Sequence, residues 1–149
     1  MKNRILAMLM AAALCLGVAA VTVPAGQAFS DVSGDVAEAV EVLSGLGIVS
    51  GYSDGGYHPG DTLTRAQFCK LAVLAEGHAD QVKNSAYKTL FSDVPATGWA
   101  APYVNLAYEE GMVAGYGNGL FGPDDAVSCG QAVTIVLRLL GYTTADVGP

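Results

Sequence analysis

Apolar side chains recur with helical spacing in four segments of this chain, and stretches rich in glycine and polar residues separate these segments. Residues 36–46 follow the i, i+3, i+4, i+7 pattern of a helix with one buried face. Residues 65–76, 100–110 and 129–140 carry apolar positions with similar spacing. The pattern predicts an all-α fold made of short helices.

Two of the segments begin with the same cap signal. Thr64 with Gln67, and Ser128 with Gln131, form the S/T-x-x-Q pattern of a capping box, in which each side chain bonds the other residue's backbone N–H. Helices are therefore predicted to begin just after Thr64 and Ser128. Residues 132–140 are apolar on nearly every side, so we expect this helix to be the most buried one.

The other two helices have different start signals. Asp35 with Glu38 predicts a capping box for the first helix, and Gly47 is expected to end it. The helix that begins near residue 100 carries Pro102 in its first turn, where the missing N–H does no harm. Gly111 is expected to end that helix.

Two loops, residues 51–59 and 115–123, join these helices in pairs. Each loop contains an Asp-Gly or Asn-Gly dipeptide, which favours a tight turn with positive φ. Tyr57 and Phe121 lie near the ends of the loops, and we expect both to fold back as apolar plugs. Each unit of the chain therefore reads as helix, loop, helix.

The chain contains two copies of this unit. Residues 29–32 and 91–94 are the identical tetrapeptide Phe-Ser-Asp-Val, and residues 47–52 match residues 111–116 at an offset of 64 positions. Ordered matches of this kind indicate an internal duplication. The predicted division is a first repeat over residues 29–77, a linker over 78–90, a second repeat over 91–142 and a C-terminal tail over 143–149.

Residues 1–28 have the order of a secretory signal peptide: a short basic start, a long apolar run and a small-x-small cleavage site at residues 26–28. An uncut membrane anchor is one alternative, because the apolar run is about long enough to span a bilayer. A lipoprotein signal at Cys15 is another, although Leu14 before it is not a small residue. Cleavage after Ala28 predicts a secreted protein with no membrane segment.

The net charge and the number of cysteines exclude some classes of partner and a fold held by disulfides. Cleavage removes Lys2 and Arg4 and leaves five basic residues against fourteen acidic ones, a net charge of −9. Such a surface argues against nucleic acid and anionic lipid as partners. Two remaining cysteines do not make a disulfide framework. Cys69 is expected to be a buried free thiol, although a bridge to Cys129 stays open. No cofactor or metal site is predicted.

The repeats resemble the S-layer homology family, whose pattern runs F-x-D-V, W-A, G-I/V-x-x-G-Y, a D/N-G turn, P and T-R-A-E. The resemblance covers nearly all of residues 29–142. The matching positions are Phe29, Asp31, Val32, residues 47–52, Asp54-Gly55, Pro59 and residues 64–67 in the first repeat, and Phe91, Asp93, Val94, Trp99-Ala100, residues 111–116, Asn118-Gly119 and Pro123 in the second.

The resemblance implies noncovalent anchoring to secondary cell-wall polysaccharide, often pyruvylated, and a cell-wall or S-layer location. It also implies a pseudo-threefold helical bundle with ligand grooves between repeats, in which the arginine of the T-R-A-E motif, here Arg65, reads the ligand. Two repeats would form only part of such a bundle. Self-association, or a third repeat from another chain, is expected to cover its open side.

The chemistry of the expected glycan site is consistent with this. A guanidinium pairs well with the carboxylate of a pyruvate ketal, and the first turn of a helix offers N–H groups and a partial positive charge. Arg65 stands directly after the cap Thr64. Trp99 could give a sugar ring an apolar platform. The predicted glycan-binding residues are Arg65, Asp31, Thr64, Trp99, Asp93, Gly51 and Gly115.

Each of these residues also has a simpler interpretation. Arg65 could be a solvated residue at a helix start, and Trp99 could belong to the core. Asp31 and Asp93 could cap local turns. Gly51 and Gly115 could be needed mainly for backbone geometry.

The sequence departs from the family pattern in several places. Cys129 and Gly130 replace the motif arginine and alanine of the second repeat, so an anion site there is expected to be lost or altered. Gln67 and Gln131 replace the motif glutamates, and Asp35-Val36 stands where the family has W-A.

Three other functions compete with glycan anchoring. The loss of the second arginine favours a cell-surface assembly module that binds protein and no glycan. An enzyme is not expected, because no nucleophile–base–orienter set is present. Calcium binding by aspartates lacks the ligand spacing of an EF-hand loop; the aspartates concerned are Asp54, Asp61, Asp124 and Asp125.

Overall fold

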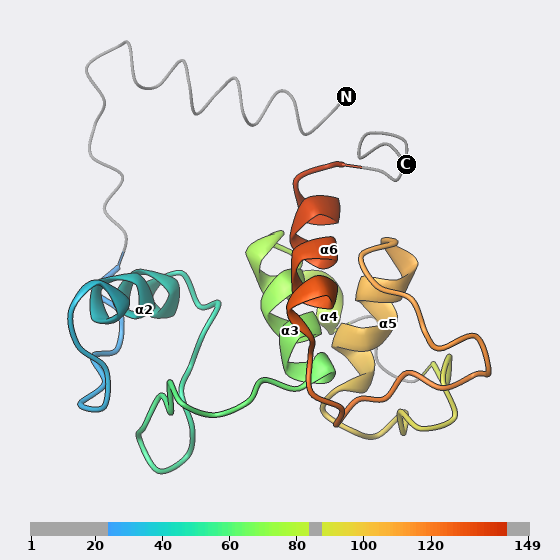
Figure 1. Ribbon diagram of the computed structural model, residues 1–149, viewed down its shortest axis with the longest axis horizontal. Helices are drawn as coiled ribbons and strands as arrows, with labels where there is room; N and C mark the ends of the chain where they lie inside the picture. The colour runs from blue at the N-terminus through green and yellow to red at the C-terminus, as the bar shows by residue number, and fades with distance from the viewer. Residues whose placement is uncertain (1–23, 84–87, 143–149) are drawn as a thin grey trace.

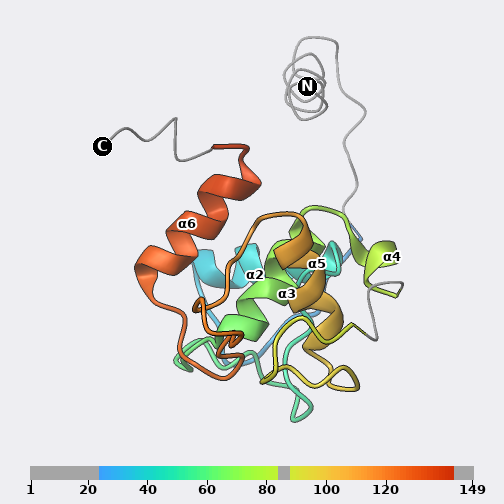
Figure 2. The same ribbon diagram turned by 90° about the vertical axis from the view of Figure 1, so that its right-hand side faces the viewer.

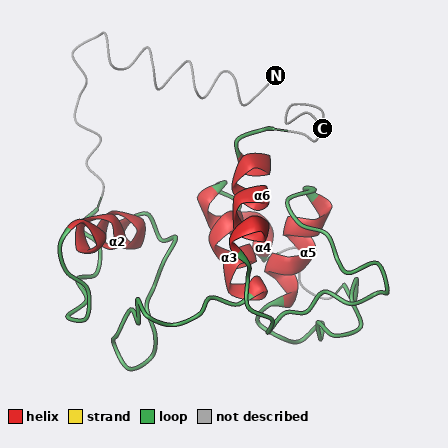
Figure 3. Cartoon of the chain, in the orientation of Figure 1, coloured by secondary structure: helices red, strands yellow, loops and turns green. Residues whose placement is uncertain are grey.

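The computed structural model describes residues 24–83 and 88–142, and in these residues the only regular elements are helices (Figure 3). The all-α prediction is confirmed. Most of the predicted signal peptide and the predicted tail lie outside the described residues. The helices are α2 (Asp35–Gly45), α3 (Arg65–Ala75), α4 (Ala79–Val82), α5 (Ala101–Glu109) and α6 (Cys129–Leu139).

Both predicted capping boxes are present at the starts of α3 and α6. The Thr64 N–H donates to Oε1 of Gln67 at 2.8 Å, and the Gln67 N–H donates to Oγ1 of Thr64 at 3.2 Å. Ser128 and Gln131 exchange the same two bonds at 3.0 and 3.2 Å. Each box satisfies donors that a helix start otherwise leaves without partners.

The capping box predicted at Asp35 and Glu38 is wrong. Gly34 is the N-cap residue of α2, with φ 62°, and no side chain caps this helix. Asp35 is already the first helical residue, so its carboxylate acts on the first turn only through its charge. The prediction for the first helix of the second repeat is confirmed, since α5 begins at Ala101 and carries Pro102 in its first turn.

The four longer helices end in the same way. In α2, the N–H of Gly47 donates to Ser44 O at 2.9 Å and the N–H of Ile48 donates to Leu43 O at 2.9 Å, which is the Schellman pattern. The pattern requires a left-handed residue, and glycine adopts it without strain. The same bonds occur at the ends of α3, α5 and α6, where the left-handed glycines are Gly77, Gly111 and Gly141.

The main helix packing crosses the boundary between the two repeats. α3, the second helix of the first repeat, packs most extensively against α5, the first helix of the second repeat, and also contacts α6. The largest apolar cluster draws on α3, α5, α6 and the second loop. α2 enters none of the main helix pairings, and Figure 1 shows it set apart from the other helices. Repeats defined by sequence are therefore not separate packing units.

The prediction that the helix over residues 132–140 is the most buried is wrong. Ile135 is the only buried residue of α6, and Figure 2 shows this helix on the outer side of α3. α5 is the central helix instead, because α3 and α4 both pack against it. α6 therefore presents apolar side chains to solvent, among them Val133, Val136 and Leu140 just beyond its end.

The two described cysteines are both free. Cys69 is buried in α3, and burial raises the pKa of its thiol to about 12. This confirms the prediction of a buried free thiol. Cys129, at the start of α6, is exposed.

Candidate functional site

Each repeat carries a groove between its loop and its second helix. The first-repeat groove has a volume of about 220 Å³ and the second-repeat groove about 390 Å³. Eight lining positions correspond at the repeat offset of 64. They are residues 48–52, 67, 70 and 71 in the first groove and residues 112–116, 131, 134 and 135 in the second.

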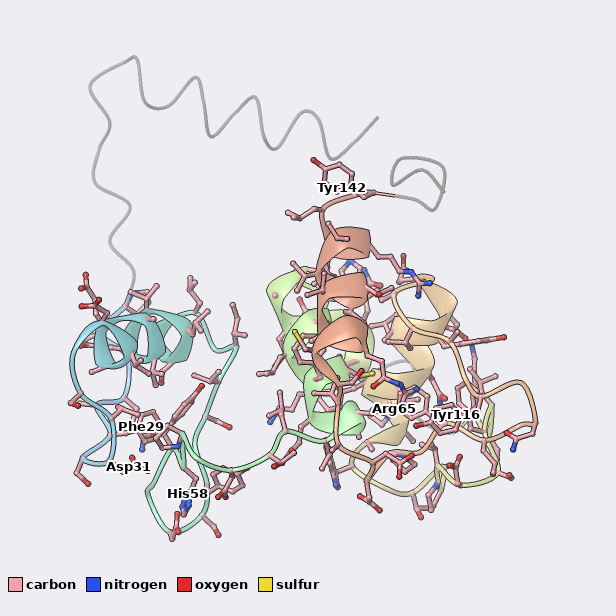
Figure 4. All side chains as sticks on the ribbon, in the orientation of Figure 1. Phe29, Asp31, His58, Arg65, Tyr116 and Tyr142 are labelled. Atoms are coloured by element: carbon pink, nitrogen blue, oxygen red, sulfur yellow. The ribbon has the colours of Figure 1, made fainter. Side chains whose placement is uncertain are left out.

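The aspartate of each Phe-Ser-Asp-Val tetrapeptide holds the end of its loop. The Asp31 carboxylate accepts the backbone N–H of Tyr57 at 3.0 Å and that of His58 at 2.7 Å. Asp93 accepts the N–H groups of Phe121 and Gly122, at 2.9 and 2.7 Å. Figure 4 shows Asp31 beside His58 in the first repeat. These contacts match the turn-capping interpretation; a ligand role for either carboxylate stays a prediction.

These bonds lower the pKa of both aspartates. For Asp31, the His58 N–H is the largest influence and the Tyr57 N–H the next, and both favour the ionised form. For Asp93, partial desolvation is the largest single influence and raises the pKa, but the N–H groups of Gly122 and Phe121, together with smaller influences that include the charge of Arg65, outweigh it. The two carboxylates are therefore charged at neutral pH and fix the loop backbone.

Gly51 and Gly115 allow an aromatic ring to reach the loop backbone. A Cβ atom on Gly115 would lie 2.4 Å from Cε1 of Phe91, and one on Gly51 would lie 2.2 Å from the same atom of Phe29. Both phenylalanines are buried. The close approach explains why these positions hold glycine, and it places both residues in the groove wall as backbone.

Arg65 joins the two repeats. Its Nε donates to Phe121 O at 3.0 Å and its Nη2 donates to Ala114 O at 3.1 Å. The guanidinium carbon lies 4.5 Å from the centre of the Phe121 ring and 4.8 Å from that of Tyr116. Arg65 is only 7% exposed, so it is not a solvated residue at a helix start. It nevertheless lines the second-repeat groove, where Figure 4 shows it next to Tyr116.

The first turn of α3 does not offer free N–H groups. The N–H of Arg65 donates to Asp125 O at 2.9 Å, and that of Ala66 donates to Pro123 O at 3.0 Å. The N–H of Gln67 is taken by Thr64 in the capping box. The expectation that this helix start contributes N–H donors to an anion is therefore wrong, because the second-repeat loop occupies them.

The two grooves differ in charge. Arg65 and Arg138 line the second-repeat groove, and no acidic residue lines it. Arg138 donates from Nη1 to Met112 O at 3.0 Å, which holds it at the groove wall. The first-repeat groove combines Lys70 with Asp61 and His58. Of the two, only the second-repeat groove offers cations without a carboxylate in its wall, so it suits an anionic group better.

The structure brings some predicted site residues together and leaves others apart. Arg65 and Gly115 share the second-repeat groove, and Gly51 lines the first. Trp99 is 56% exposed and lines neither groove, so it is not a core residue. Within the described parts of the chain, no group of three or more His, Cys, Asp or Glu side chains is placed to hold a metal ion.

Sequence reasoning missed Arg138 and the groove role of Tyr116. Arg138 corresponds to Leu74 in the first repeat, so the family pattern gives no reason to single it out. The signal available was its place as the only basic residue of an otherwise apolar helix. Tyr116 is exposed in the groove wall, with its hydroxyl donating to Asp125 at 2.8 Å.

Two helix-loop-helix units, each with an aspartate that fixes its loop, define a helical repeat module without a metal-binding cluster in its described residues. Comparison with known families identifies the module. The family model of the S-layer homology domain matches residues 28–69 and 90–133, which correspond to the two repeats. The chain belongs to this family, which is a non-catalytic anchoring domain.

Several curated bacterial proteins contain a similar segment. The chain is 36% identical to the middle cell wall protein of Brevibacillus brevis over 89% of its own length and 13% of that protein. It is 39% identical to the surface layer protein of Brevibacillus choshinensis over 69% of its length and 9% of that protein. It is 35% identical to a cell surface protein of Thermoanaerobacter kivui over 98% of its length and 20% of that protein.

The chain thus spans a fifth or less of these relatives. The family and the relatives locate it at the cell surface or in the cell wall. In the residues that the structure describes, none of the helices has the length and apolar character to cross a membrane.

Proposed function

We propose that the chain anchors its protein noncovalently to the secondary cell-wall polysaccharide, and that an anionic substituent of this glycan, such as a pyruvate ketal, binds in the second-repeat groove. The observation that carries the proposal is the pairing of Arg65 and Arg138 in a groove wall without carboxylates, on a chain whose net charge is −7. A local cationic site on an acidic protein selects for anions by its own field.

The two arginines have different parts in this proposal. Arg65 is rigid, because two backbone carbonyls and two aromatic rings hold its guanidinium. Arg138 is exposed on α6 and lines the same groove. A carboxylate between them would gain charge-assisted hydrogen bonds of about 1.5–3 kcal/mol each. The Tyr116 ring at the groove edge would lie against the sugar.

Co-sedimentation with purified wall sacculi, before and after removal of the secondary polymer, tests the proposal. Arg138→Gln removes the charge but keeps a donor for Met112 O, so the fold is preserved. We expect it to weaken binding about tenfold, as the loss of one charged hydrogen bond predicts. Lys83→Gln is the matched control, because the Lys83 side chain is 80% exposed and lies outside the groove.

Binding that needs the polymer and Arg138, and that ignores Lys83, supports anchoring through this groove. Binding that needs the polymer but ignores Arg138 would place the glycan elsewhere on the chain. Trp99 is then the next residue to substitute, because it is exposed and lies outside both grooves.

One observation favours a second candidate, a cell-surface assembly module that binds no glycan. The guanidinium of Arg65 is used between the repeats, so its position has a structural explanation without any ligand. Absence of binding to sacculi, with or without the secondary polymer, would favour this candidate over anchoring.

A further inference from the structure

The face that α3 buries is exposed on α6. The buried residues of α3 are Arg65, Ala66, Cys69, Ala72 and Val73. Their counterparts 64 positions later are Cys129, Gly130, Val133, Val136 and Leu137, and none of these is buried. Val133 is 51% exposed, whereas its counterpart Cys69 is 0% exposed. The packing surface is thus present in both repeats and covered in only one.

This open face of α6 is apolar along one line. Cys129, Val133, Val136 and Leu140 follow each other at i, i+4, i+7 and i+11, which places them on one side of the helix. We call these four residues the α6 stripe. The second-repeat groove uses other α6 positions, Gly130, Gln131, Thr134, Ile135 and Arg138. The stripe is therefore separate from the proposed glycan site.

α2 also exposes apolar residues whose counterparts in the second repeat are buried. It corresponds to α5, the helix that covers α3. Leu106 of α5 is 4% exposed, and its counterpart Val42 in α2 is 43% exposed. Ala100 is buried before α5, and its counterpart Val36 is exposed. Among the described residues, no helix packs on α2 as α3 packs on α5.

The loops repeat this asymmetry. Met112, Val113 and Phe121 are buried where α3 and Arg65 meet the second loop, and their counterparts Ile48, Val49 and Tyr57 are only half-buried. The first-turn N–H groups of α3 are taken by the carbonyls of the second loop. In residues 24–83 and 88–142, no acceptor takes the N–H groups of Cys129 and Gly130, their counterparts in α6.

We propose that the chain associates head to tail with a second copy of itself, so that α6 of one copy packs on α2 and residues 48–61 of the next. The contact would repeat between copies the packing of α3 on α5 and residues 112–125 within one chain. Both uncovered halves of the interface belong to this chain, which is why a second copy fits. Charge is compatible, because α2 carries three carboxylates and no cation, and α6 carries one arginine and no carboxylate.

The contact joins two different surfaces, so each added copy leaves one α6 and one α2 free unless a ring closes. Oligomers that grow with protein concentration are therefore expected. The proposal does not rest on glycan binding, and its test contains no wall polymer.

Sedimentation velocity of the purified chain over a range of concentrations tests the contact. The double variants Val133→Glu/Val136→Glu and Val36→Glu/Val42→Glu each place two charges in one half of the interface and should stay monomeric. All four residues are exposed in the single chain, so helicity by circular dichroism should not change. Leu90→Glu/Leu120→Glu is the control with equal charge at exposed leucines elsewhere, and it should associate as the original chain does.

Mixing the two double variants gives the sharpest result. The intact α6 of one variant can bind the intact α2 of the other, so the mixture should form dimers and nothing larger. An α2 variant that still associates alone would overturn the proposal, because α6 would then pair with α6 or with another surface. A chain that is monomeric at every concentration would overturn it as well and leave the α6 stripe to a repeat of another protein.

A gain of association provides an independent check. Cys129→Arg restores the residue that Arg65 provides in α3, and its guanidinium should reach the carbonyls of Ser50 and Tyr57 in the next copy. These are the counterparts of Ala114 and Phe121. Two charged hydrogen bonds should tighten association at least about tenfold. Cys129→Lys adds the same charge without the planar guanidinium, so it should tighten association less. Equal gains in the affinity of association from both variants would contradict the proposed contact geometry.

Discussion

Arg65 Nε donates to the carbonyl of Phe121 at 3.0 Å, although 56 positions separate the two residues in the chain. The same guanidinium lies 4.5 Å from the centre of the Phe121 ring. Asp93 holds the Phe121 N–H from the other side. Phe121 is thus fixed by one residue of each repeat, and this makes the second-repeat loop the joint between them.

Arg65→Ala should therefore destabilise the fold more than the loss of a surface charge would. It leaves the carbonyls of Phe121 and Ala114 without their donor and removes a side chain that packs between two rings. We expect a loss of about 2–4 kcal/mol in the free energy of unfolding, measured by urea denaturation. Lys83→Ala should change it by less than about 0.5 kcal/mol. Similar losses in the free energy of unfolding for the two variants would show that Arg65 does not hold the two repeats together.

Gly115→Ala should destabilise the second repeat, because the new Cβ would lie 2.4 Å from the Phe91 ring and 2.8 Å from Leu120 O. We expect a cost of about 1–3 kcal/mol, the usual range for overpacking. Gly130→Ala is the matched control, since no atom lies within 4 Å of its Cβ and the residue is helical. It should stabilise the chain slightly, by about 0.5 kcal/mol. Thermal melts of both variants compare the two, and a neutral Gly115→Ala would contradict the close approach of Phe91.

Local features of the fold could be predicted from the sequence, because local interactions set them. The capping boxes at Thr64 and Ser128 each involve residues three apart, and both are present. The start of α2 was missed because Gly34, in a left-handed conformation, takes the cap position that Asp35 was expected to hold. Glycine and aspartate are both good N-cap residues, and the sequence alone does not reveal which of the two adopts the backbone conformation of the cap.

Long-range packing could not be predicted in the same way. The apolar pattern of α6 predicted a buried helix, but only Ile135 of α6 is buried in the described chain. The same limit applies to Arg65: its motif position predicted importance, whereas its contacts with a loop 49 and 56 positions away required the structure. Arg138 enters the site only through the folding of α6 beside that loop.

Asp93→Asn should lower stability at neutral pH and flatten its acid dependence. Because the pKa of Asp93 is lower in the folded chain than its ordinary value of 3.8, ionisation contributes stability above that value and the contribution is lost as the pH falls through the lowered pKa. The difference between original and variant should therefore shrink below about pH 4. Urea midpoints at pH 7 and at about pH 3 measure it, and a pH-independent difference would rule out this linkage.

The two described thiols should differ strongly in reactivity. Burial raises the pKa of Cys69 to about 12, so almost no thiolate forms at pH 8, and the thiol is shielded from reagents. Cys129 is exposed at the start of α6. Iodoacetamide followed by peptide mass spectrometry should find Cys129 alkylated and Cys69 unmodified in the folded chain. Unfolding in urea should make both react, which controls for reagent access to each peptide.

Trp99 is the only tryptophan of the chain, so its fluorescence reports one position. Its 56% exposure predicts emission close to that of tryptophan in water and efficient quenching by iodide in the free protein. If Trp99 also supports a sugar ring, the wall polymer should shift the emission to shorter wavelength and reduce quenching, because stacking excludes water from one ring face. Arg138→Gln should weaken this response in proportion to wall binding if both residues contact one glycan. A response that is absent while Arg138-dependent binding persists would remove Trp99 from the site and leave the second-repeat groove to act alone.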